Sequence, residues 1–106
     1  MRIFIKPLSV NQAWQGKRFK TDKYLRYEKE ILSLLPNVPT EKPPFKFEII
    51  FGFSNSLSDI DNPLKPLLDC IQKKYKINDR DIYELNVKKE IVKKGFEFID
   101  LKIYSI

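Results

Sequence analysis

Short carboxylates gather in one part of a chain that is otherwise basic. Five of its seven aspartates fall within 23 consecutive positions that hold no glutamate: Asp59, Asp61, Asp69, Asp79 and Asp81. Oxygen ligands in basic surroundings favour Mg²⁺ or Mn²⁺, with water and a substrate phosphate completing the coordination. The pattern therefore indicates a metal site that hydrolyses a phosphodiester, with Lys65 placed to orient water or to balance charge in the transition state.

Each of these residues also has a purely structural interpretation. One of the first two aspartates could cap the helix that begins near Asn62, because short acidic side chains accept hydrogen bonds from helix N-termini. Lys65 and Asp69 are four residues apart and could form an ordinary surface ion pair. Asp79 and Asp81 could be turn residues. Both interpretations stay open at this point.

The composition limits the other kinds of chemistry. A chain of 106 residues is expected to form one domain, residues 1–106. A single cysteine, Cys70, and no histidine exclude an intramolecular disulfide, a zinc finger and a histidine general base. A net charge of +6 favours a polyanionic partner. No apolar run is long enough for a membrane helix and no signal peptide is evident, so we expect a cytoplasmic protein without a membrane partner.

The hydrophobic pattern predicts the elements that position the aspartates. Thr21 is a suitable N-cap for a helix that ends at Pro36, and phenylalanine and isoleucine alternate over 45–53 as in a strand. A second helix is expected to start at Asn62–Pro63, with Pro66 in its first turn. The remaining strands are predicted at 2–6, 82–90 and 95–106. The predicted fold is α+β, a mixed four-stranded sheet with two helices in the order β-α-β-α-β-β, whose last two strands form a hairpin.

This arrangement has a consequence for the acidic side chains. Asp59 and Asp61 lie where a strand ends and a helix begins, so a turn into the helix can bring them together beside Lys65. If the strand after Asp79 pairs beside strand 45–53, we expect Asp79 near the mouth of the same site.

Four segments together resemble the RusA-type Holliday junction resolvases. They are PLSVN, GKRFKTDKYLRYEKEI, DIDNPLKPLLD and INDRDIYELNVKKE. The resemblance implies a RusA-like fold and a homodimeric, Mg²⁺-dependent endonuclease that resolves four-way DNA junctions by paired nicks in recombination and repair. Such proteins are often encoded by phages or prophages, which places this one in a bacterial or phage-infected cell, near the nucleoid.

The resemblance also implies roles for individual residues. By position, Asp59, Asp61 and Asp79 match the metal-binding carboxylates, and Lys65 matches the catalytic lysine. The family usually has two adjacent aspartates before the third strand, preceded by a glycine, whereas this chain has Asn78 as the first of the two and no such glycine; Asp81 is therefore an alternative ligand.

Basic residues outside the acidic window are candidates to contact DNA. The expected contacts come from the loop near Trp14, from the second helix and from the last connection: Lys17, Arg18, Lys20, Lys73, Lys88 and Lys93. Two cuts in a two-fold symmetric junction need two sites, which a homodimer supplies. Two alternatives remain, a non-catalytic nucleic-acid-binding module and a nuclease that acts on flaps, forks or RNA.

Overall fold

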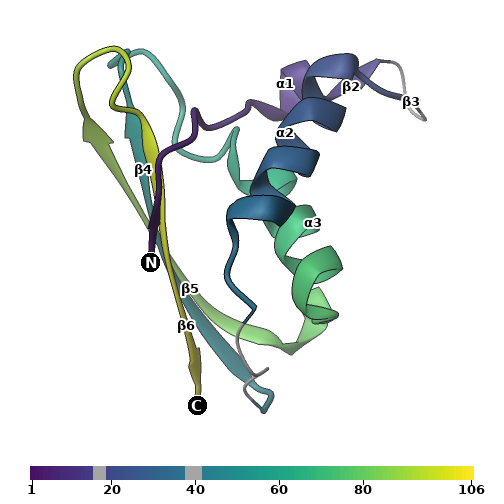
Figure 1. The fold of residues 1–106 in the computed structure, drawn as a ribbon. Coiled ribbons are helices and arrows are strands. Elements are labelled where there is room, and N and C mark those ends of the chain that lie inside the picture. Colours follow the sequence, from purple (N-terminus) through teal and green to yellow (C-terminus); the bar gives the residue numbers. More distant parts are fainter. Residues whose placement is uncertain (16–18, 38–41) are drawn as a thin grey trace.

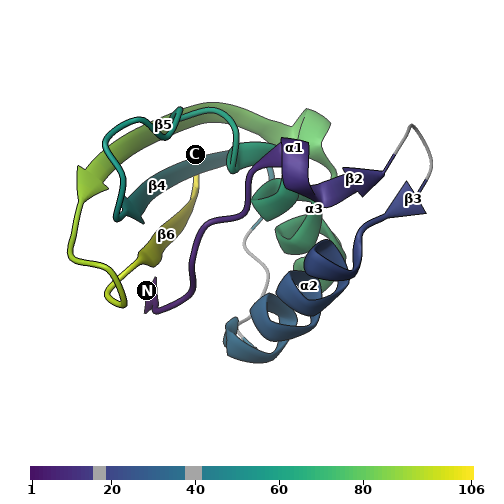
Figure 2. The ribbon, with the colours of Figure 1, turned by 90° about the horizontal axis from the view of Figure 1, so that it is seen from above.

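The computed structural model describes residues 1–15, 19–37 and 42–106 and shows a small α+β domain of two layers. A four-stranded mixed sheet forms one layer, and the longer helices lie together on one of its faces (Figure 1; Figure 2). The elements are β1 (Arg2–Ile3), α1 (Val10–Ala13), β2 (Trp14–Gln15), β3 (Phe19–Lys20), α2 (Asp22–Leu34), β4 (Phe45–Phe53), α3 (Leu64–Tyr75), the 3₁₀ helix η1 (Asp79–Asp81), β5 (Ile82–Ile91) and β6 (Phe98–Ser105).

Helix α2 begins where its sequence predicts. The Thr21 hydroxyl accepts a hydrogen bond from the Tyr24 amide at 3.1 Å, which satisfies one of the free N–H groups of the first turn. Tyr24, Tyr27 and Ile31 recur at helical spacing and are buried, as expected for core residues. The helix ends at Leu34, just before Pro36.

Helix α3 also follows the prediction. Pro66 is its third residue, where the missing N–H costs no intrahelical hydrogen bond. The apolar stripe of α3 faces the sheet, with Leu67 and Ile71 fully buried. Lys76 ends the helix in a left-handed conformation with φ 56°.

The predicted hairpin of the last two strands is wrong. The strand order is β1-β6-β4-β5, so β5 and β6 lie on opposite sides of β4. β5 runs parallel to β4 and α3 forms the crossover between them, whereas β6 pairs antiparallel with β4. Alternation of apolar residues has the same period in either pairing, so it could not distinguish a hairpin from two strands that flank a third.

Two short elements lie in a region predicted to be an irregular loop. Ser9 starts the turn α1, since its carbonyl accepts from the Gln12 amide at 2.9 Å and its hydroxyl from the Asn11 amide at 3.2 Å. β2 and β3 then form a small antiparallel ribbon. The described residues thus contain three α-helices, one more than predicted. None of them is long and apolar enough to span a membrane.

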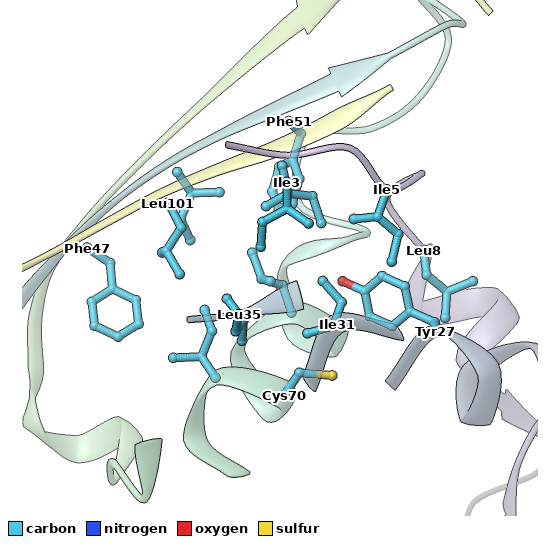
Figure 3. Packing of buried hydrophobic residues seen from close by; sticks show 14 of the residues in the cluster. Ile3, Ile5, Leu8, Tyr27, Ile31, Leu35, Phe47, Phe51, Cys70 and Leu101 are labelled. Atoms are coloured by element: carbon cyan, nitrogen blue, oxygen red, sulfur yellow. The ribbon is translucent and has the colours of Figure 1, made fainter. Parts of the chain in front are cut away.

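The hydrophobic core fills the space between the sheet and helices α2 and α3 (Figure 3). β4 contributes the predicted alternating stripe, in which Phe47, Ile49 and Phe51 are at most 1% exposed. Ile31 meets this stripe from α2 and Cys70 from α3. The core holds α3 against the sheet and therefore fixes both ends of that helix relative to β4.

The opposite face of the sheet has little cover. Its main apolar feature is the Phe98 ring, which lies over Gly52 and carries the Arg2 guanidinium at 3.9 Å from its centroid. A Cβ at Gly52 would lie 2.3 Å from the ring, so only glycine allows this approach.

Candidate functional site

The loop of residues 54–63 joins the end of β4 to the start of α3 and carries the first two aspartates of the acidic window. Three segments hold it in place. Within the loop, the Asn55 side chain accepts from the Leu57 amide at 2.8 Å. From β5, the Lys89 ammonium donates to the carbonyls of Ser56 and Ser58 at 2.9 and 2.6 Å. From the N-terminal region, the Val10 amide donates to the Asn62 carbonyl at 2.8 Å.

A cleft of about 870 Å³ lies against this loop. One wall is the loop itself, including Asp59 and Asn62, and the other is the segment that contains Lys6, Ser9 and Asn11. The PLSVN and DIDN motifs of the sequence analysis are thus neighbours in space. Most of the groups that line the cleft are polar, as expected for a site that receives a charged, hydrated ligand.

Asp59 and Asp61 are exposed and carry no salt bridge with any cation in the described part of the chain. Asp59 accepts a hydrogen bond of 3.3 Å from the Asn62 side-chain amide and lines the cleft. Neither carboxylate caps α3, because the residue before the helix, Pro63, shows no side-chain cap and the Leu64 amide bonds instead to the Asp61 carbonyl at 3.1 Å. The capping interpretation is wrong for both residues.

Lys65 lies in the first turn of α3, next to this loop. Its ammonium is 3.5 Å from the Asp69 carboxylate, which is the i,i+4 ion pair that the sequence allowed. The Lys65 side chain is 64% exposed, so water screens the pair and the ammonium can leave Asp69 at little cost. The pair and a role in catalysis are therefore compatible.

Asp79 and Asp81 lie at the other end of α3. They belong to η1, where Asn78 caps the turn by accepting from the Arg80 amide at 3.1 Å, and they have the turn positions of the structural interpretation. Because β4 and β5 are parallel, Ile82 pairs with Phe45 at the start of β4, whereas the acidic loop follows Phe53 at its end.

The expectation that Asp79 lies near the mouth of the same site is thus wrong within one chain. The twelve residues of α3 rise by about 18 Å along the helix and separate the two acidic pairs. Among the described residues, no three acidic or cysteine side chains converge in a group that could hold a metal ion. Asp59, Asp61 and Lys65 belong to the segment at the start of α3, whereas Asp79 and Asp81 lie at its other end.

The residues expected to contact DNA are scattered. Lys17 and Arg18 lie outside the described residues, as does the side chain of Trp14. Lys88 is on the uncovered face of the sheet, away from the acidic loop, and Lys93 is exposed in the connection between β5 and β6.

Lys20 and Lys73 are both engaged by one carboxylate. Glu28 accepts from Lys20 at 2.9 Å and from Lys73 at 2.7 Å, which ties α2 to α3 and to β3. Burial opposes ionisation of Glu28, but the hydrogen bonds from the two lysines outweigh it and lower the pKa of this carboxyl below its usual value. One carboxylate is thus shared by two lysines, so it neutralises half of their combined charge.

Cys70 takes no part in chemistry at the surface. Its side chain is fully buried in the hydrophobic core. Burial, together with the nearby negative charge of Glu28, raises the pKa of the thiol to about 12. The thiol therefore stays protonated at neutral pH and is not a nucleophile.

Lys89 is the residue of this region that the sequence analysis missed. It stands on the face of β5 that carries Leu85, Val87 and Ile91, and so interrupts an apolar alternation. A lysine at such a position is the available signal, because a cation that points toward the core side of a sheet needs acceptors, here two loop carbonyls.

Comparison of the chain with models of known protein families and with curated protein sequences gives no match.

Proposed function

We propose that this chain is a metal-dependent endonuclease that resolves four-way DNA junctions, of the RusA type that its motifs resemble. The observation that carries the proposal is the pair Asp59 and Asp61, two exposed carboxylates without a cationic partner among the described residues, in a braced loop beside a polar cleft. A pair with only a structural role in the loop would be expected to cap α3 or to form a salt bridge.

The residues present are compatible with Mg²⁺ or Mn²⁺. Mg²⁺ is commonly held by one or two carboxylates and completed by waters and substrate phosphates, so Asp59 and Asp61 suffice as the protein ligands. A divalent cation bound there polarises the phosphodiester and stabilises the leaving oxygen. Lys65, released from Asp69, balances negative charge on the phosphate, and Lys89 keeps the loop that carries the carboxylates in place.

The position of Asp79 makes the proposal more specific. Since Asp79 lies at the far end of α3, it can act as a third ligand only if a second copy of the chain supplies it. A two-fold dimer that pairs Asp59 and Asp61 of one protomer with Asp79 of its partner would contain two complete sites, the number that paired nicks require.

The test is cleavage of an end-labelled four-way junction by the 106-residue chain, beside a linear duplex and a fork of equal length, with Mg²⁺, with Mn²⁺ and with EDTA. We expect paired nicks in the junction with either metal and none with EDTA. Equal cutting of the fork would replace the junction by a broader substrate class. Binding without any cut would remove the catalytic proposal.

One alternative has a specific observation in its favour. Of the acidic window, the loop carries only Asp59 and Asp61, of which Asp59 lines the cleft, and no group of three such side chains forms among the described residues, so the chain could be a binding module that keeps the fold and has no catalytic role. In that case the affinity for DNA would be independent of metal, and Asp61→Asn would leave every measured property of the complex unchanged.

A further inference from the structure

The N-terminal segment presents two side chains outward beside the cleft. Ile3, Ile5 and Pro7 are buried, whereas Phe4 and Lys6 alternate with them and are exposed. The Phe4 ring is 68% exposed, although a large aromatic ring on a small domain is normally covered. An exposed aromatic beside a lysine is the combination that stacks on nucleic-acid bases while the cation meets the backbone.

A second hollow, of about 400 Å³, lies between this segment and α2. Phe4 and Lys6 line one side of it, and Lys23, Arg26 and Glu30 line the other. The three α2 residues are three and four positions apart, so they share one face of the helix. The charged side chains of the hollow comprise three cations and one carboxylate.

The cations of α2 in this hollow differ from those that bind Glu28. Lys23 and Arg26 form no ion pair with the residues that the structure describes, whereas Lys20 and Lys73 are both bound to a carboxylate. Two cations three residues apart on one helix face repel each other, a cost that an anionic ligand between them lowers.

The hollow adjoins the cleft of the acidic loop. Lys6, Pro7 and Gln12 line both depressions, so a strand with phosphates at Lys23 and Arg26 needs to pass only these shared residues to reach the side of the cleft that Asp59 lines. The two depressions together run from α2, over the N-terminal segment, to the start of α3.

We infer that this combined groove binds a DNA strand that leaves a branch point, with Lys6, Lys23 and Arg26 on its phosphates and Phe4 stacked on an unpaired base. The inference rests on the proposed function, because it leads the strand to Asp59. It assigns DNA contacts to residues other than the six basic residues expected from the sequence.

Equilibrium binding in EDTA tests the phosphate contacts, because no cleavage can occur there and the result does not depend on the catalytic proposal. The probe is a fluorescein-labelled four-way junction, titrated with the full chain at several salt concentrations. We expect Lys23→Ala/Arg26→Ala to weaken binding about tenfold near physiological salt. We also expect it to reduce the slope of log K against log salt by about 1.5, since each phosphate contact contributes roughly 0.7 to 0.9.

The matched control is Lys42→Ala/Lys102→Ala, which removes the same charge from exposed lysines elsewhere. Lys102 lies on the uncovered face of the sheet, and Lys42 precedes β4. If both double variants reduce the slope of log K against log salt equally, binding depends only on the net charge, and the proposed groove is rejected.

The single acid of the hollow offers a test with the opposite sign. Glu30→Gln removes a negative charge from the same wall and should strengthen binding of the junction about twofold to fivefold in EDTA. Weaker or unchanged binding would contradict the placement of phosphates along α2.

Phe4→Ala tests the stacked base. Its ring is exposed, so the fold does not depend on it. We expect about tenfold weaker binding to a fork with an unpaired strand and no change for a linear duplex of equal length. Equal loss on both probes would exclude stacking. If the groove variants bind DNA in EDTA as well as the unchanged chain does, this inference is rejected. If their binding weakens as expected but the unchanged chain shows no Mg²⁺-dependent cleavage, only the proposed function is rejected.

Discussion

The two acidic ends of α3 have similar side chains and different surroundings. At one end, Asp59 and Asp61 sit in a ten-residue loop that β5 and the N-terminal segment brace from outside and that borders a cleft. At the other end, Asp79 and Asp81 belong to a 3₁₀ turn capped by its own neighbour, Asn78. Because other segments hold the loop in place, its two carboxylates are available for a ligand. The 3₁₀ turn is held by its own cap and needs no ligand for its structure.

The largest difference between the two ends should appear in catalysis. Asp61→Asn is expected to reduce Mg²⁺-dependent junction cleavage at least about 100-fold and to leave binding intact or tighter, because removal of a charge eases the approach of phosphate. Asp81→Asn, made in parallel, should change cleavage less than about threefold. The measurement is single-turnover cleavage with saturating enzyme. Joint loss of binding and cleavage in Asp61→Asn would make the residue structural.

Mixing two inactive variants tests whether Asp79, at the C-terminal end of α3, contributes to the site of a second copy of the chain. If Asp79 completes the partner's site, Asp61→Asn and Asp79→Asn are each inactive, but a mixture contains heterodimers with one intact site. We expect such a mixture to nick one strand of the junction without paired resolution. No activity in the mixture would reject a site shared between protomers, and an active Asp79→Asn protein would remove Asp79 from the ligands.

The next difference between the two ends is that Lys89 of β5 holds the loop in place from outside. Lys89→Ala removes two hydrogen bonds from an ammonium to loop carbonyls, which should lower the free energy of unfolding by about 1 kcal/mol and the cleavage rate about tenfold. Lys88→Ala, one residue earlier and on the other face, should leave unfolding within about 0.5 kcal/mol. Urea unfolding monitored by circular dichroism measures both. A stable Lys89→Ala protein with normal cleavage would show that the loop needs no brace.

The smallest effect concerns the attachment of α3, the helix that separates the ends. Glu28→Gln weakens the hydrogen bonds from Lys20 and Lys73 and should cost about 1 kcal/mol at neutral pH. Because the folded pKa of Glu28 lies below the ordinary value of 4.5, this contribution is present above pH 4.5 and disappears as the pH falls through the folded pKa. Unfolding free energies of both proteins from pH 7 to pH 3 should therefore converge. A constant difference would assign the loss to packing.

The sequence predicted the elements around α3 and misplaced the far acidic pair for one reason. Thr21, Pro36 and the apolar periods act within a few residues of chain, so helices α2 and α3 and strand β4 could be read directly. Strand pairing is a long-range property, and the hairpin and the parallel crossover have the same local pattern. The strand after Asp79 does pair beside β4, as the expectation for Asp79 assumed, but its parallel direction places Asp79 at the start of β4 and not at its end.

The candidate site was predictable to a similar extent. The spacing of Asp59, Asp61 and Lys65 predicts them on one turn-to-helix segment, and the structure places the two aspartates in the loop before α3 and Lys65 in its first turn. The groove of Phe4, Lys6 and α2 could not be found from spacing, because its walls meet only after the N-terminal segment packs across the helix layer.

The position of β6 in the sheet also matters while the chain is being made. β6 lies between β1 and β4, so the strand nearest the C-terminus completes the interior of the sheet and not its edge. On the ribosome, β1 has no partner until residues 98–105 emerge, and β4 exposes an unpaired side with several large apolar residues. From the time β4 is made until β6 emerges, the nascent chain therefore carries an open sheet edge, which favours pairing with other chains and aggregation.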